Sequence, residues 1–177
     1  MGIIKRLQIA RSRKGQALKF LFGGGTIIAH TELIARKLVD GKEVERRRVV
    51  KDRVVTTAFV DYVVDNLIAE VAAFGDFKFH DSGTGTTAEA AADAQLVNDC
   101  GEARDTGTQV EGTSANIYKS VATHTYAGTF AITEHGLFNL ATLAAGTLMD
   151  RTVFAAINVV SGNQIEFTFN ITLTAGG

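Results

Sequence analysis

The sequence predicts a mainly β (α+β) fold, a small antiparallel β-sandwich or barrel with one covering helix and an extended, basic N-terminal arm. Residues 164–173 alternate apolar and polar side chains, as in a strand with one buried face. Residues 59–71 place apolar side chains at spacings of three and four, which is typical of an amphipathic helix. Basic residues concentrate in residues 1–53, ahead of both patterns.

Composition limits the classes of protein to consider. The chain has 177 residues, of which 46% are hydrophobic, so it can bury a core as one domain with an appendage. No apolar run reaches the roughly 18 residues that a membrane helix needs, and residues 1–6 do not open a secretion signal. Cys100 is the single cysteine, and we expect it to act as a small apolar side chain. We therefore expect a soluble protein.

Charge separates the arm from the body. Residues 1–53 hold fourteen basic and five acidic side chains, a net charge of +9. Residues 54–177 hold four basic and fourteen acidic side chains, a net charge of −10. Such asymmetry predicts an arm that docks on an acidic partner.

Three interpretations of the basic arm remain: docking on a protein, a plain solvated face, or binding of nucleic acid. Nucleic acid is the least favoured, because Phe20 and Phe22 are the only aromatic residues available for stacking. Protein docking is favoured. The side chains expected to dock are Arg11, Arg13, Lys14, Lys19, Arg36, Lys37, Arg46, Arg47, Arg48, Lys51 and Arg53.

Two turn signals give the arm local structure. Residues 23–25 are three glycines between apolar runs at 18–22 and 26–31, which permits a β-hairpin or a hinge. A phosphate loop is rejected, because the lysine and hydroxyl that it needs after the last glycine are missing. Asp40-Gly41 is the second turn signal. We expect extended structure whose pairing partners other subunits can supply.

The helix is expected near residues 56–72. Thr56 and Thr57 are both candidate N-caps, and Gly75 stands where a helix stop belongs. The apolar stripe between them is wide enough to cover the apolar side of the β body. A coiled coil is less favoured, because the repeat lasts only about two heptads.

The body, residues 54–177, reads as a series of short strands. Residues 77–80 alternate like a half-buried strand, and residues 88–96 are alanine-rich and predict a short helix after Thr86 or Thr87. Residues 105–112 are polar and glycine-rich, so we expect an exposed loop. The remaining predicted strands are residues 117–126, 128–133, 147–156 and 165–173, the last two joined at Ser161-Gly162-Asn163.

The sequence offers little chemistry. His30, His80, His124 and His135 stand singly, without the spacing of a helical zinc site. Glu134-His135 is the best local acid/base pair, but it is expected at a strand-to-turn junction with no nucleophile nearby. Asp93, Asp99, Glu102 and Asp105 do not match a calcium-loop spacing. We expect no enzyme, no catalytic residue, no metal site and no cofactor.

Four segments of the body, taken in order, resemble a recurrent class of tailed-bacteriophage virion proteins. They are residues 82–89 (SGTGTTAE), 130–139 (FAITEHGLFN), 146–154 (GTLMDRTVF) and 164–173 (QIEFTFNITL), preceded by the helical segment 54–69. Members of that class serve as capsid decoration (cement) proteins, as collar or neck components, or as tail-fibre-like modules. The resemblance implies a virion structural protein, and no active site comes with it.

The resulting expectation is a decoration protein that stabilises the capsid surface by bridging capsomers through its N-terminal arm. The alternative is a neck, collar or tail-fibre-like module, and a nucleic-acid-binding factor is less favoured. The expected partners are the major capsid protein and other copies of the chain, as a homo-oligomer. A trimer is the geometry that the resemblance implies. No membrane contact is expected, and synthesis is expected in the bacterial host cytoplasm.

Overall fold

The computed structural model describes residues 27–52, 55–67 and 76–175, which form nine strands and one helix. The elements are β1 (Ile27–Val39), β2 (Lys42–Asp52), α1 (Thr57–Leu67), β3 (Phe79–Gly83), β4 (Asp105–Thr106), β5 (Val110–Glu111), β6 (Ile117–Thr125), β7 (Phe130–Phe138), β8 (Leu148–Val159) and β9 (Gln164–Ala175). The prediction of a mainly β fold is confirmed.

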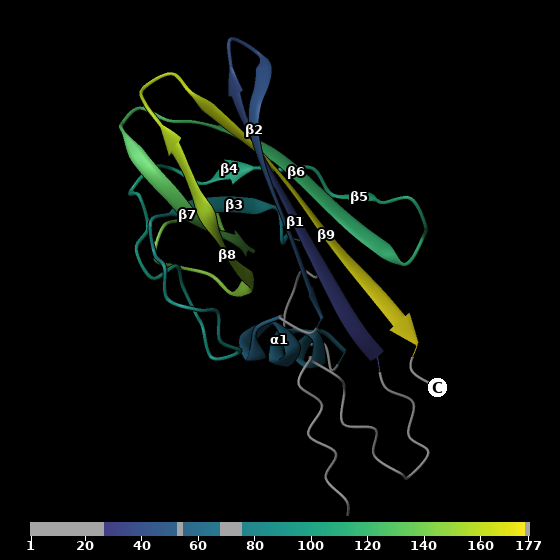
Figure 1. Cartoon of the computed structure of the whole chain (residues 1–177). Helices are drawn as coiled ribbons and strands as arrows, with labels where there is room; N and C mark the ends of the chain where they lie inside the picture. Colours follow the sequence, from purple (N-terminus) through teal and green to yellow (C-terminus); the bar gives the residue numbers. More distant parts are fainter. Residues whose placement is uncertain (1–26, 53–54, 68–75, 176–177) are drawn as a thin grey trace, which may run out of the picture.

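The strands form two sheets in which every pair of neighbours is antiparallel (Figure 1). The larger sheet has the order β2-β1-β9-β6-β5, and the smaller has the order β4-β3-β7-β8. The helix α1 lies at one end of the sheets, and the turn between β1 and β2 lies at the other (Figure 1).

One apolar core joins the inner faces of the two sheets. Leu33 and Phe167 of the larger sheet share a buried cluster with Ile132 and Ile157 of the smaller one. The predicted alternation of β9 is confirmed, since its side chains Ile165, Phe167, Phe169 and Ile171 are buried. Burying each such side chain contributes about 1.5–3 kcal/mol to folding. Leu173 is the exception among the predicted inner residues and is 47% exposed.

The helix α1 begins as the sequence predicts. Thr56 is the N-cap, because its hydroxyl accepts a hydrogen bond from the Phe59 N–H at 3.1 Å. Phe59 and Tyr62 pack edge-to-face on the buried Phe77, with ring centroids 5.0 and 5.1 Å away. The helix therefore closes the apolar interior at this end of the sheets. The predicted stop at Gly75 lies outside the described residues.

The expectation of an extended arm is wrong for residues 27–52. β1 pairs with β9 from Ile27↔Ala175 to Leu38↔Gln164, so these residues are the middle and edge of the larger sheet. The pairing partner is β9 of the same chain. This pairing buries the apolar side chains Leu33 and Ala35 of β1 in the core. Asp40 and Gly41 have φ angles of 50° and 74°, which confirms the predicted two-residue turn. The hairpin proposed across residues 23–25 lies outside the described residues.

The helix predicted at residues 88–96 is also wrong. The segment is irregular, with a turn closed by Asp93 N–H donating to the Ala90 carbonyl at 3.0 Å. Side chains of β7 and β8 hold the backbone on either side of it: Arg151 donates to the Thr87 carbonyl and Glu134 accepts from Val97 N–H. These tertiary contacts outweigh the helix propensity of alanine.

The strands beyond residue 105 differ from the prediction in extent and pairing. The expected loop at residues 105–112 contains β4 and β5, and so crosses from one sheet to the other. The turn at residues 161–163 joins β8 to β9, but the two strands belong to different sheets. β6 is confirmed, and its buried face is the polar one, with Ser120 and His124 inward.

Candidate functional site

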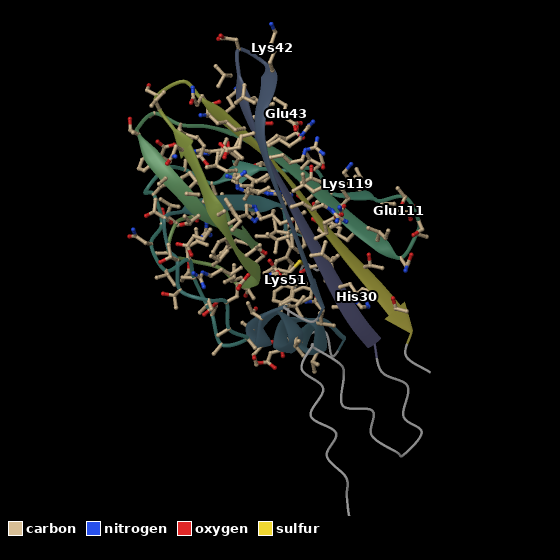
Figure 2. All side chains as sticks on the ribbon, viewed as in Figure 1. His30, Lys42, Glu43, Lys51, Glu111 and Lys119 are labelled. Atoms are coloured by element: carbon tan, nitrogen blue, oxygen red, sulfur yellow. The ribbon has the colours of Figure 1, made fainter. Side chains whose placement is uncertain are left out.

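A groove of about 800 Å³ lies on the outer face of the five-stranded sheet. We call it the sheet groove. Its lining comes from β2, β1, β9 and β6 and from the segment around β5. Figure 2 labels three lining residues from different strands, His30, Glu111 and Lys119. The groove is open to solvent and crosses the sheet.

The register of the strands decides which side chains meet in the sheet groove, because successive side chains of a strand point to opposite faces. Three rows cross the sheet from β2. They are Arg46, Arg36 and Glu166; then Arg48, Ile34, Thr168 and Val121; then Val50, Glu32, Asn170 and Lys119. The groove therefore has guanidinium groups toward the β1–β2 turn and apolar side chains between charged ones.

Carboxylates hold the arginines of the groove in place. Arg46 donates from Nε and Nη2 to the two oxygens of Glu43, both at 2.8 Å, and Arg36 pairs with Glu166 and Glu43. The hydrogen bond from Arg46 is the main cause that lowers the pKa of Glu43 below its usual value. Arg48 donates from Nε to Glu32 at 2.6 Å.

The cationic groups lie nearer the solvent than their partners. The side chains of Arg48 and Arg46 are 64% and 53% exposed, whereas those of Glu32 and Glu43 are 25% and 33% exposed. Lys119 makes no ion pair with the residues that the structure describes. Donors of Arg48 and Lys119 are thus available to an acidic ligand entering the groove.

Six of the residues expected to dock are described, and the structure divides them into two sets. Arg36, Arg46 and Arg48 lie in the sheet groove. Lys37, Arg47 and Lys51 point the other way and donate to carbonyl oxygens of β8: Asn158 at 2.6 Å, Ala155 and Ala156 at 3.0 Å, and Arg151 at 2.6 Å. Arg11, Arg13, Lys14, Lys19 and Arg53 lie outside the described residues.

The second set has a structural role. β8 is an edge strand of the smaller sheet, so its outward carbonyl groups need donors that no neighbouring strand provides. The long cationic side chains of β1 and β2 supply those donors and connect the two sheets at this edge. Lys51 also forms an ion pair with the buried Asp150 at 3.2 Å. The sequence analysis did not separate this set from the outward one.

Glu134-His135 does not lie at a strand end as expected. Both residues are in the middle of β7, and both are 0% exposed. Glu134 accepts hydrogen bonds from the Gly85 and Asn98 N–H groups and from Arg151 Nε at 2.6–2.9 Å. Burial raises the pKa of Glu134, but these donors outweigh it and leave the pKa below its usual value.

Burial favours the neutral form of two interior histidines, His80 and His135. His80 Nδ1 and His135 Nε2 are 2.9 Å apart, and His80 Nε2 is 2.8 Å from the Ser120 hydroxyl. Burial lowers the pKa of His80 to about 3 and that of His135 well below its usual value. The side chains around His80 and Asp81 leave no space for a water-sized ligand. These groups organise the interior and are closed to a substrate.

A buried ion pair secures the loop after β3. Arg104 donates from Nε to Asp81 at 2.8 Å and from Nη1 to the carbonyls of Leu140, Thr142 and Ala145 at 2.8–2.9 Å. Its guanidinium lies 3.5 Å from the centroid of the Phe138 ring. Burial raises the pKa of Asp81 to about 6. Arg104 therefore connects the buried Asp81 of β3 to the loop between β7 and β8.

Comparisons of the chain with protein-family models, with curated proteins and with solved structures find no match. Within the described ranges, no group of three His, Cys, Asp or Glu side chains is arranged to hold a metal ion. None of the helical segments described is long and apolar enough to cross a membrane. The sheet groove is the site that the geometry supports for contact with another molecule.

Proposed function

We propose that the chain is a structural protein of a tailed-bacteriophage virion, a capsid decoration protein with the β-sandwich architecture that two packed sheets suggest. The observation that supports a docking role is the sheet groove, a broad outer face lined by cationic side chains (Arg36, Arg46, Arg48 and Lys119) and acidic ones (Glu32, Glu111 and Glu166). The interior around His80 and Asp81, by contrast, leaves no space for a water-sized ligand. The resemblance of the body to virion proteins is the reason for proposing a phage capsid as the surface to which the chain binds. Neck, collar and tail-fibre-like modules share that resemblance and remain the alternative.

The ion pairs of the groove bear on which residues we propose to bind the shell. The charged partners of Arg36, Arg46 and Arg48 show that part of the basic charge of residues 27–52 is already compensated. Residues 1–26 contain six basic side chains and no acidic one. These six are Lys5, Arg6, Arg11, Arg13, Lys14 and Lys19. The proposed strap on an acidic shell surface is therefore confined to residues 1–26.

Weak contacts suffice for such a role when copies act together. A single exposed ion pair contributes about 0–1 kcal/mol. A protein that binds a symmetric shell through two surfaces makes the second contact at high effective concentration, so several weak contacts add to a stable coat. Bridging neighbouring capsomers in this way opposes their separation under the pressure of packaged DNA.

The experiment is binding to shells that lack the protein, measured by co-sedimentation. Replacing Arg11, Arg13, Lys14 and Lys19 by glutamine is expected to weaken binding at least tenfold, with unchanged thermal unfolding. Deleting residues 1–53 is unsuitable, because it removes β1 and β2 from the larger sheet. Wild-type protein that fails to bind the shells at low salt contradicts the proposal.

A further inference from the structure

The outward face of α1 carries apolar and acidic side chains that could complement the arginines and apolar side chains of the sheet groove. Val60 and Val64 are 49% and 50% exposed, and Asp61 and Asp65 stand beside them at the same spacing of four residues. The helix has no basic residue between Thr57 and Leu67. Residues four apart lie on the same side of a helix, so an apolar row runs beside an acidic row. The opposite side of α1 holds Phe59 and Tyr62 against the core.

The groove offers a matching pair of rows. Arg46, Arg48 and Val50 follow one another on the outer face of β2, and Ile34 and Val121 extend the apolar part across the sheet. Alternate residues of an antiparallel strand are about 6.8 Å apart. Residues four apart on a helix are about 6 Å apart along its axis. Two carboxylates of α1 can therefore face two guanidinium groups of β2 at nearly equal spacing.

The dimensions also fit a helix. Three strand spacings separate β2 from β6, a width of about 14 Å. An α-helix with its side chains is about 10–12 Å across. Lys119 stands on the far side of that width and makes no ion pair with the described part of the chain. A helix lying in the groove meets arginines on one side and this lysine on the other.

We infer that the sheet groove binds the outward face of α1 of a second copy of this chain. Within one copy, α1 covers an end of the sheets (Figure 1), whereas the groove occupies the outer face of the larger sheet, so the contact joins different copies. It pairs two different surfaces, and such head-to-tail contacts close into rings when the rotation permits. The inference goes beyond the proposed function, because it identifies the surfaces of the self-association expected from the sequence.

The ionic part of the contact forms between charged groups that still have free donors or acceptors within one copy. Arg48 uses only Nε for Glu32, and its terminal nitrogens contact no acceptor among the described residues. Asp61 and Asp65 likewise make no hydrogen bond or ion pair within the described ranges. Docking adds these pairs and buries Val60 and Val64 against Val50 and Ile34. Added salt is expected to weaken the association, because surface ion pairs are screened.

Sedimentation velocity of the full chain over a range of concentrations tests the inference. Wild type is expected to form an oligomer, and Arg46→Glu with Arg48→Glu, or Asp61→Lys with Asp65→Lys, is expected to weaken it at least tenfold. Combining all four substitutions is expected to restore association, because both charged surfaces are reversed together. Lys42→Glu at the exposed β1–β2 turn is the matched control and leaves association unchanged.

A second variant distinguishes loss of the contact from misfolding of the groove variant. Arg46→Glu and Arg48→Glu place carboxylates beside Glu43 and Glu32, so Val60→Ser with Val64→Ser tests the same contact without altering the groove. A wild type that stays monomeric overturns the inference, as does a groove variant or a Val60/Val64 variant that associates like wild type. A folded quadruple variant that stays dissociated also overturns it. A monomeric chain can still coat a shell, and an oligomer absent from virions leaves this contact intact, so the two proposals fail separately.

Discussion

Arg36 of β1 and Arg46 of β2 lie directly opposite each other in the larger sheet, and the Glu43 carboxylate accepts hydrogen bonds from both. Like charges in such a cross-strand pair repel each other. Glu43 therefore holds the most cationic part of the sheet groove in one arrangement. The arginines of the groove are therefore stabilised by the carboxylates that lie between them.

Replacing Glu43 by glutamine removes the negative charge that offsets the repulsion between Arg36 and Arg46. We expect a lower urea midpoint of unfolding at low salt and a smaller loss at high salt, because the groups are exposed and screened. Equilibrium unfolding at two ionic strengths measures it. Glu45→Gln, in the same strand, is the comparison. An equal effect of Glu43→Gln at both ionic strengths contradicts the electrostatic explanation.

Thr56→Ala is expected to destabilise the protein by about 1 kcal/mol, because the Phe59 N–H loses its N-cap acceptor. Thr57→Ala is the matched control, since Thr57 is exposed and already within the helix. Urea unfolding of both variants distinguishes the two candidate caps. Equal losses for Thr56→Ala and Thr57→Ala would contradict the assignment of Thr56.

Arg151→Met is expected to cost about 3–5 kcal/mol, because it leaves the buried Glu134 carboxylate without its cationic partner. Adding Glu134→Gln to that variant should recover part of the loss. A double-mutant cycle of unfolding free energies measures the coupling. Additive losses, with no coupling between the two positions, would mean that the pair at 2.6 Å does not contribute as a unit.

The stability of the fold should fall as pH rises through the titration of His124. Its Nδ1 faces Asp105 and its Nε2 faces Glu102, and carboxylates only accept hydrogen bonds, so the ring is protonated. Burial lowers the pKa of His124, but the two carboxylates outweigh it and raise the pKa above its usual value. A raised folded pKa gives stability that is complete below the unfolded pKa of about 6.5 and is lost above the folded one.

The test is the pH dependence of unfolding in wild type and His124→Gln. Other titratable groups around the ring, which the comparison must share, are Tyr126, His80, Asp81 and Cys100. The loss between neutral and alkaline pH should be smaller in the variant, and the pKa of His124 measured by nuclear magnetic resonance should exceed 6.5. Parallel pH profiles in wild type and variant would show that His124, with Asp105 and Glu102, contributes nothing to the pH dependence of stability.

The features that could be predicted from the sequence are local ones. The alternation of β9, the cap at Thr56 and the Asp40-Gly41 turn each depend on a few adjacent residues. Local geometry sets these features, so a single sequence displays them. The helix expected at residues 88–96 was also a local inference, and it failed because side chains of β7 and β8 hold the backbone at Thr87 and Val97, on either side of the segment.

The candidate site depends on contacts that are far apart in the chain. Arg36 and Glu166 are 130 residues apart in sequence and paired across β1 and β9. The sequence indicated that residues 1–53 are basic, but only strand order shows which of their side chains face the groove and which face β8. The signal that could have pointed to this face is the alternation of Arg46, Arg48 and Val50 along β2, which the sequence analysis did not use.

The proposal that this chain is a capsid decoration protein is tested most directly by its copy number in purified virions of the phage proposed to encode it. Quantitative mass spectrometry normalised to the major capsid protein gives that number. We predict one copy per shell subunit, or a simple fraction such as one third, as symmetric coats require. A count that fits a single ring would assign the chain to the neck or tail, and its absence from virions would contradict a structural role.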